Sequence, residues 1–256
     1  MEIAINGCSA IISGGTKGIG LAIAKSLLDE GVNVTVFSRN IKNLQIAKKL
    51  TTSVSTNAHA HFIQADITKN TDRKKIISQH LKKFSSLDFL INNAGQSIKN
   101  GSSESKWTQS FNVNVTAHAL LTELALPSLE KSKNGASVVN IASIYGRESG
   151  GNAHYNASKA AMISFSKTTS NLLIAKGIRV NSVAPGSILF PNGSWDKRVK
   201  SEPKKMKDFV KQNIPAGRFG TVEEIANVVT FLLSPKSSWI VGATINVDGG
   251  QSKSNI

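Results

Sequence analysis

Seven short apolar runs alternate along this chain with longer segments of helical periodicity. The runs are rich in Val and Ile without polar alternation, and they span residues 9–13, 32–37, 60–64, 87–91, 137–142, 178–184 and 242–248. Strands with this pattern are buried on both faces, as in a parallel sheet covered by helices. We therefore predict a doubly wound α/β sheet of about seven parallel strands, with right-handed crossovers, flanking helices on both faces and ligands at the carboxyl ends of the strands.

Length and composition predict a single domain over residues 1–256. The chain has 256 residues, of which 40% are hydrophobic, and this is enough for one large core. The N-terminus shows no basic segment followed by a long apolar core, and no apolar run approaches the roughly 18 residues needed to cross a bilayer. The single cysteine, Cys8, excludes an internal disulfide and a Cys-rich metal cluster. We expect a soluble, cytoplasmic protein without a metal site.

The formal net charge of +15 could attract nucleic acid, an anionic membrane or an acidic partner. Most lysines are spread over expected helix surfaces, and no basic run is interleaved with aromatic residues for base stacking. This favours a solvated basic surface, with no nucleic acid and no membrane as partner. The exception is the stretch 187–213, the basic segment, in which seven Lys and Arg accompany three acidic residues. A long irregular stretch inside a compact domain is usually functional.

A glycine-rich turn directly follows the first expected strand. Gly14, Gly18 and Gly20 form the pattern G-x-x-x-G-x-G at the start of a helical segment. Their backbone can approach a pyrophosphate closely, and the helix that follows directs its N-terminal N–H groups at the phosphate. Glycines also mark ordinary tight turns, but the position between strand and helix favours a dinucleotide site.

The end of the second expected strand indicates which dinucleotide is bound. Ser38 and Arg39 stand about 20 residues after the turn, where a carboxylate would bind the ribose 2′-hydroxyl of NAD. Arg39 can instead bind the 2′-phosphate of NADP, with Lys17 reaching it from the turn. We predict NADP(H) as the cofactor. Asp66, after the third strand, could accept a hydrogen bond from the adenine or cap a helix, and the sequence leaves both interpretations open.

Tyr155 and Lys159 lie four residues apart in a stretch of small residues, "NAHYNASKAAM", at 152–162. In a helix the two side chains share one face. A cation beside a phenol favours the phenolate and lowers its pKa from about 10. The pair could therefore transfer a proton, or it could be a half-buried aromatic residue with a solvated neighbour, and the pattern alone does not decide.

Further motifs follow three more of the expected strands. "NNAG" occupies 92–95, Ser143 precedes Tyr155 by twelve residues, and "APG" occupies 184–186. With the glycine turn and the Tyr-Lys pair, these motifs resemble the classical short-chain dehydrogenase/reductase family over essentially the whole chain, which implies a Rossmann-like fold. The C-terminal stretches "IPAGRFGTVEEIANVVTFLLS" and "DGG" are most similar to those of 3-oxoacyl-[acyl-carrier-protein] reductases.

The resemblance implies catalytic roles for four residues. Tyr155 would donate a proton to the substrate oxygen as hydride arrives from the nicotinamide, and Lys159 would hold the nicotinamide ribose and lower the pKa of Tyr155. Ser143 would hydrogen-bond the carbonyl oxygen and steady the developing negative charge. Asn114 would anchor a water that links Lys159 to bulk solvent.

The resemblance also implies the binding contacts. The expected cofactor-binding residues are Ser13, Gly14, Thr16, Lys17, Gly18, Ile19, Gly20, Ser38, Arg39, Asp66, Ile67, Asn93, Ala94, Gly95, Tyr155, Lys159, Pro185, Gly186 and Ile188. Phe190 stands about where relatives often have a Thr that binds the nicotinamide carboxamide, so the backbone of Ile188 is expected to serve alone. Tyr145 and Arg147 are candidate substrate contacts, although Arg147 could equally pair with Glu148.

In the family the segment after "PG" covers the substrate, so the basic segment is expected to be a lid. Its charge and the resemblance lead to the hypothesis of NADPH-dependent reduction of a 3-oxoacyl thioester, carried by CoA or by an acidic acyl carrier protein. Another small ketone, a sugar or a steroid remains an alternative substrate. A redox-inactive NADP-binding protein and a nucleic-acid binder remain alternatives of another class. Relatives assemble as tetramers or dimers, which implies a homotetramer or homodimer.

Overall fold

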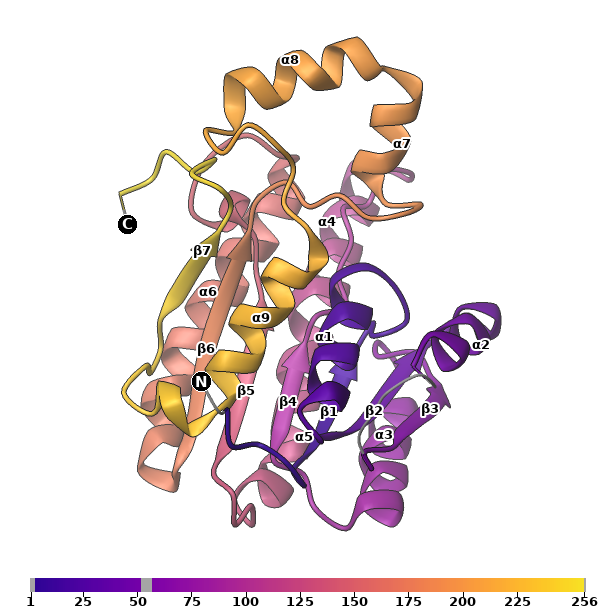
Figure 1. Ribbon diagram of the computed structural model, residues 1–256, viewed down its shortest axis with the longest axis vertical. Coiled ribbons are helices and arrows are strands. Elements are labelled where there is room, and N and C mark those ends of the chain that lie inside the picture. Colours follow the sequence, from indigo (N-terminus) through magenta and orange to yellow (C-terminus); the bar gives the residue numbers. More distant parts are fainter. Residues whose placement is uncertain (1–2, 52–56, 256) are drawn as a thin grey trace.

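One parallel sheet organises the protein, whose computed structural model describes residues 3–51 and 57–255. Its seven strands are arranged in the order β3-β2-β1-β4-β5-β6-β7, and every neighbouring pair is parallel (Figure 1). The strands are β1 (Ser9–Ser13), β2 (Asn33–Ser38), β3 (Ala60–Gln64), β4 (Phe89–Asn92), β5 (Ala136–Ile141), β6 (Ile178–Pro185) and β7 (Thr244–Val247). This order confirms the predicted doubly wound α/β fold.

Helices connect the strands and cover both faces of the sheet. They are α1 (Gly18–Asp29), α2 (Ile41–Leu50), α3 (Asn70–Phe84), α4 (Ser103–Phe111), α5 (Ala117–Leu129), α6 (Ala153–Leu173), α7 (Ser194–Ser201), α8 (Pro203–Asn213) and α9 (Val222–Leu233), with shorter turns η1 (Asn112–Thr116), η2 (Ile144–Gly146), η3 (Ile174–Lys176) and η4 (Pro235–Ser237). Within the described part of the chain, none of these helices has the length and apolarity needed to cross a membrane.

The central strand β1 contributes alternate residues to two separate cores. Ala10 and Ile12 pack with α1 and α9 on one face, whereas Ile11 packs with α3 and α5 on the other. Because both faces are covered, each residue of β1 is buried, and the strand sequence contains no polar alternation. The double burial is the physical basis of the continuous apolar runs from which the fold was predicted.

The sheet reverses its strand order at β1, and this reversal places the candidate site. The chain runs outward from β1 to β3 in one direction, and from β4 to β7 in the other. The pairing of Ile12 with Ile91 sets the ends of β1 and β4 side by side. The glycine turn after β1 and the "NNAG" motif at the end of β4 therefore meet at the carboxyl edge of the sheet, where ligands bind in such folds.

The basic segment is largely helical, so the prediction of an irregular stretch is wrong. Its helices α7 and α8 lie beyond the carboxyl edge of the sheet, at the top of Figure 1. Trp195 on α7 stacks at 4.9 Å from Phe209 on α8 and lies 5.3 Å from Phe219, measured between ring centroids. The aromatic residues of the two helices meet in this cluster. Their helical pattern is inconspicuous in the sequence because lysines surround them.

The last strand is shorter than the predicted range 242–248. Gly242 has φ of +69° and Gly249 has φ of +62°, and both values fall in the left-handed region that a strand does not use. β7 is therefore confined to the residues between these two glycines. The strand still ends beside Pro185 and Gly186, so the "DGG" motif joins the carboxyl edge of the sheet.

Candidate active site

The glycine turn packs so closely on the segment after β4 that side chains would not fit. Gly14 has φ of +63°, and a Cβ there would lie 3.0 Å from the Cα of Ala94. A Cβ on Gly20 would overlap the side-chain amide of Asn93. α1 begins at Gly18 with no side-chain cap on its first N–H groups. The turn therefore offers uncapped backbone donors in a cradle that a Cβ would fill, which fits a pyrophosphate.

Ser13 ties this turn to the "NNAG" motif. Its buried hydroxyl accepts hydrogen bonds from the backbone N–H of Asn93 at 2.8 Å and of Ala94 at 2.9 Å. In return, the side-chain amide of Asn93 donates to the carbonyl of Ser13 at 2.8 Å. These hydrogen bonds thus connect the two loops that flank the expected dinucleotide site directly.

Arg39 and Asp66 lie together at the ends of β2 and β3. The Arg39 Nη1 is 3.9 Å from the Asp66 carboxylate, and the Arg39 side chain is 64% exposed. Burial raises the pKa of Asp66, but hydrogen bonds from Thr68 and the charge of Arg39 lower it more, so its pKa lies below the usual value. The carboxylate accepts from the Thr68 N–H at 3.0 Å, while the N-cap position of α3 is Lys69. The helix-cap interpretation of Asp66 is therefore wrong.

Helix α6 carries the Tyr-Lys pair on one face, as its spacing predicts. The Lys159 ammonium lies 5.8 Å from the centroid of the Tyr155 ring. Lys159 is only 4% exposed, and its Nζ donates a 2.7 Å hydrogen bond to the carbonyl of Ile141 at the end of β5. Burial lowers the pKa of Lys159 to about 8. At neutral pH this side chain is still mostly a buried cation.

Ser143 completes the pair with a hydrogen bond to Tyr155. Burial raises the pKa of the Tyr155 phenol, the Ser143 bond acts to lower it, and Tyr145 adds to the rise. The pKa of Tyr155 is therefore raised rather than lowered as expected, because the burial of the phenol outweighs the bond from Ser143. Ser143 is itself buried, and its oxygen accepts from the Tyr145 N–H at 3.2 Å, which fixes the turn η2.

Asn114 lies in a π-helical turn, η1, between α4 and α5. Its Oδ1 accepts from the Gln96 N–H at 2.9 Å, and its Nδ2 donates to the hydroxyl of Ser158 at 2.9 Å. A Cβ on Gly95 would lie 3.2 Å from Asn114 Oδ1 and 3.3 Å from Lys159 Nζ. A π-turn in a helix often marks a functional site. The structure thus brings all four predicted catalytic residues to one place, beside the last glycine of "NNAG".

Comparison with known proteins decides the family. A family model described as Enoyl-(Acyl carrier protein) reductase matches residues 14–252. The 3-oxoacyl-[acyl-carrier-protein] reductase of Chlamydia trachomatis is 35% identical over 246 residues, which cover 94% of this chain and 96% of that protein. The chain belongs to the short-chain dehydrogenase/reductase family. It is therefore an oxidoreductase that acts on a carbonyl or alcohol group, in a family that binds a nicotinamide cofactor.

Two solved structures share the fold of this short-chain dehydrogenase/reductase. L-sorbose reductase from Gluconobacter frateurii, complexed with NADPH and L-sorbose, has a TM-score of 0.91 and 27% identity, and the match covers 99% of this chain and 100% of that one. A 7α-hydroxysteroid dehydrogenase complexed with NADH and 7-oxo glycochenodeoxycholic acid has a TM-score of 0.88 and 27% identity, and the match covers 99% and 97% of the two chains.

The two predicted substrate contacts of this dehydrogenase/reductase, Tyr145 and Arg147, lie in different surroundings. Tyr145 lies in η2 beside Ser143 and acts on the pKa of Tyr155. Arg147 instead donates from Nη1 to the carbonyl of Thr244 at 3.1 Å and to Asn246 Oδ1 at 2.9 Å. These bonds join the loop after β5 to β7, a structural contact that the sequence did not predict. The proposed substrate contact of Arg147 stays a prediction.

Phe190 lies against the glycine turn. Its ring would be 2.9 Å from a Cβ on Gly18 and 3.0 Å from a Cβ on Gly193. The start of the basic segment is thus held on the N-terminus of α1, where the pyrophosphate is expected. From the sequence, Phe190 was only an unusual residue at its position, because its contact with the glycine turn joins segments that are far apart along the chain.

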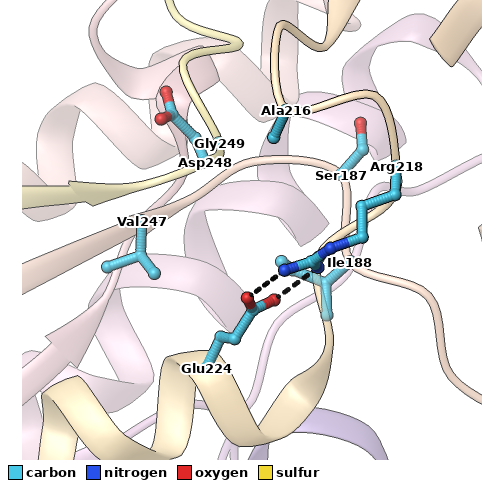
Figure 2. A pocket seen from close by; sticks show the side chains of 9 residues that line it. Ser187, Ile188, Ala216, Arg218, Glu224, Val247, Asp248 and Gly249 are labelled. Carbon is cyan, nitrogen blue, oxygen red and sulfur yellow. Dashed lines mark hydrogen bonds and ion pairs between the residues drawn. The ribbon is translucent and has the colours of Figure 1, made fainter.

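A small cavity lies where the basic segment leaves and rejoins the sheet. Its volume is about 90 Å³, and Figure 2 shows the ion pair of Arg218 and Glu224 on its wall, with contacts of 2.6 and 3.0 Å. The backbone of Leu189 donates to Gly220 at 2.9 Å, and Gly220 donates to Ser187 at 3.0 Å. The start of the basic segment is therefore paired with Gly220, which lies beyond the end of the segment. No cluster of metal-binding side chains occurs among the described residues.

Proposed function

We propose that this protein reduces a 3-oxoacyl thioester to the 3-hydroxyacyl form with NADPH. The observation that carries the proposal is the joint placement of Ser143, Tyr155, Lys159 and Asn114 beside a glycine turn that fits a dinucleotide. The 3-oxoacyl-[acyl-carrier-protein] reductase of Chlamydia trachomatis supports the choice of substrate over nearly the whole chain.

The raised pKa of Tyr155 suits reduction, because the phenol keeps its proton at neutral pH until the substrate oxygen gains charge. The bound NADPH would supply the hydride. Tyr155 donates the proton to the carbonyl oxygen, and Ser143 hydrogen-bonds the same oxygen while charge develops on it. The buried ammonium of Lys159 stabilises the phenolate that remains, and its pKa of about 8 keeps it charged at neutral pH.

The deciding experiment is NADPH consumption measured on a panel that contains acetoacetyl-CoA, simple ketones, sugars and a steroid ketone. We expect turnover of the thioester and at least about 100-fold loss of kcat in Tyr155→Phe, which keeps the ring but not the proton. Thr168→Val, which also removes a hydroxyl from α6 but at an exposed position, is the matched control and retains most of the activity. If a sugar or steroid is turned over and no 3-oxo thioester is, the substrate assignment is wrong. Dinucleotide binding without any turnover would replace the enzyme assignment.

Arg39 supports NADP(H) over NAD(H). Its guanidinium is largely exposed at the end of β2, free of a close partner except Asp66 at 3.9 Å among the described residues, so it can form a charge-assisted bond to a 2′-phosphate. Arg39→Ala is expected to lower kcat/KM for NADPH by about tenfold or more and to leave that for NADH nearly unchanged. Lys42→Ala removes an equal charge from the exposed face of α2 and should change neither value. Equal efficiency of wild type with NADH and NADPH would contradict this preference.

The basic segment supports an acidic acyl carrier protein as the carrier. Lys200 pairs with Asp196 and Lys205 with Glu202, each at 2.8 Å. Within the described residues, no ion pair engages the exposed Lys204, Lys207 and Lys211. We propose that the basic segment, 187–213, acts as a lid and that these lysines attract the carrier.

Charge reversal tests this carrier. Changing Lys204, Lys207 and Lys211 on α8 to Glu should raise KM for an acyl carrier protein substrate about tenfold at low salt. KM for acetoacetyl-CoA, which carries phosphates but lacks the extended acidic surface of a carrier protein, should change less. The matched control reverses the exposed Lys74, Lys82 and Lys83 on α3. An equal change of KM in both triple variants would refute the docking role of α8 and leave the reductase assignment intact.

We further propose a single domain over residues 1–256, a cytoplasmic location and a homotetramer or homodimer. The expected contacts are the helices that carry Asn114 and Tyr155 together with the last strand and the last helix, and the exposed Trp107, Leu172 and Trp239 are compatible with them. Sedimentation velocity would test the oligomer, and a monomer at working concentration would contradict it. Salt-dependent retardation of DNA in a gel would favour the nucleic-acid binder instead.

A further inference from the structure

A buried histidine connects the dinucleotide turn to the π-turn of Asn114. His118 lies in the first turn of α5 and is 1% exposed. Its Nε2 is 3.1 Å from the hydroxyl of Ser13, and its Nδ1 is 3.4 Å from the backbone carbonyl of Asn114. Ser13 ends β1 and Asn114 lies between α4 and α5, so the imidazole joins segments about 100 residues apart along the chain.

The hydrogen-bond partners fix the tautomer of His118. The Asn114 carbonyl can only accept, so Nδ1 carries the hydrogen and Nε2 is an acceptor. The single hydrogen of the Ser13 hydroxyl can be donated to Nε2 at 3.1 Å or to the Ile91 carbonyl at 3.3 Å, and the contact with His118 is the shorter of the two. The remaining lone pairs of Ser13 accept from the N–H groups of Asn93 and Ala94. Burial and the nearby charge of Lys159 lower the pKa of His118 to about 3. The imidazole is therefore neutral, as this arrangement requires.

The far end of the network reaches the catalytic helix. The side chain of Asn114 donates to the Ser158 hydroxyl at 2.9 Å, and that hydroxyl donates to the backbone carbonyl of Tyr155 at 2.7 Å. A continuous set of hydrogen bonds thus runs from the glycine turn through His118 to α6. In such a buried network, removal of one member leaves polar groups without partners on both sides.

We propose that His118 is a positioning residue that holds the dinucleotide turn and Asn114 in register, so that dinucleotide affinity depends on a side chain outside the binding site. The proposal rests on the proposed function to the extent that the turn after β1 binds a nicotinamide dinucleotide. His118 itself need not touch cofactor or substrate, because it acts through Ser13 and through the Asn114 carbonyl.

The test is the Kd of NADPH, measured by the change in its fluorescence on binding. His118→Leu replaces the imidazole with an apolar side chain of similar size and removes both hydrogen bonds, and we expect Kd to rise about tenfold. His118→Gln, whose amide both donates and accepts, should recover part of the affinity. The matched control is His80→Leu, since His80 is also fully buried and bonded at both nitrogens, to Thr35 and Ser86, but it is remote from the turn. The control should lower stability and leave Kd unchanged.

A double-mutant cycle separates positioning from general destabilisation. If Ser13 and His118 act as one unit, the combination of Ser13→Ala with His118→Leu raises Kd by less than the product of the two single effects. Additive effects, or a folded His118→Leu variant with the wild-type Kd, would overturn the proposal. If His118→Leu does not fold, an unchanged Kd in His118→Gln together with an unchanged Kd in Ser13→Ala would overturn it in the same way.

Failure of the proposed function has a different signature. A wild-type protein that binds neither NADPH nor NADH would overturn the dinucleotide assignment and the role of His118 with it. A wild type that binds and turns over NADPH, alongside a His118→Leu variant of equal affinity, would remove only the role of His118.

Discussion

Two buried histidines make the folded state sensitive to mild acid. His80 bonds to Thr35 at 2.7 Å and to the Ser86 carbonyl at 2.9 Å, and burial lowers its pKa to about 4 although Ser86 and Asp88 act to raise it. His118 is likewise held neutral, with a pKa lowered to about 3 by burial and by Lys159. Both groups therefore bind a proton more readily in the unfolded chain than in the folded one.

The sign and size of the effect follow from this difference. An unfolded histidine has a pKa of 6.5, so stability from each neutral side chain is fully present above pH 6.5 and is lost as pH falls toward the folded pKa. At pH 5 both folded pKa values still lie lower, so each histidine removes about 2 kcal/mol from the free energy of unfolding. The sum of about 4 kcal/mol is a large part of the 5–15 kcal/mol typical of a domain.

The assay is urea unfolding at pH 7.5, 6 and 5, followed by circular dichroism. Wild type should lose about 4 kcal/mol between the first and last pH, and His80→Leu should lose about half as much over the same interval because one titrating group is gone. His118→Leu should behave like His80→Leu in this assay, in contrast to its effect on NADPH binding. A free energy of unfolding that is flat between pH 7.5 and 5 would show that the two side chains are not held neutral, and would refute the reasoning.

Three further changes test the site and its surroundings. Gly20→Ala places a Cβ on the Asn93 amide and should weaken NADPH binding at least about tenfold by fluorescence titration, whereas an unchanged Kd would contradict the tight packing of the turn. Ser143→Ala removes the second hydrogen bond to the substrate oxygen and should lower kcat by about 100-fold with little change in the Kd of NADPH, and an unchanged kcat would refute its role. Arg218→Ala breaks an exposed ion pair and should lower stability in urea by less than about 1 kcal/mol, so a larger loss would show that the pair holds the basic segment.

The sequence predicted most of the fold because the sheet is buried on both faces. Ala10, Ile11 and Ile12 fill two different cores, and this demand produces apolar runs that are visible without any structure. The spacing of Tyr155 and Lys159 predicted a shared helix face for a similar reason, since helical geometry is local. Features that depend on local periodicity could therefore be predicted.

Features that depend on contacts between distant parts of the chain could not be predicted from the sequence. The direction of the Lys159 ammonium is set by its hydrogen bond to the Ile141 carbonyl on β5, and the direction of the Arg147 side chain is set by its hydrogen bond to β7. The Asp66 carboxylate accepts a hydrogen bond from Thr68 in a turn. An Asp side chain can form such a turn or cap a helix, and the sequence does not decide which of the two occurs. The helices of the basic segment were missed because their apolar face is a small aromatic cluster whose partner, Phe219, lies beyond the segment.

The bond from Lys159 to Ile141 changes what this lysine does in the site. Ile141 ends β5, and Ser143 follows two residues later, so the ammonium anchors the backbone that carries the hydrogen bond to Tyr155. The same cation lowers the pKa of His118 and so helps to keep the link to the glycine turn neutral. Lys159 thereby acts at two points, the strand end and the buried imidazole, and its ammonium also lies 5.8 Å from the centroid of the Tyr155 ring. Loss of its charge would disturb proton transfer and dinucleotide binding together, as expected for one member of a coupled buried network.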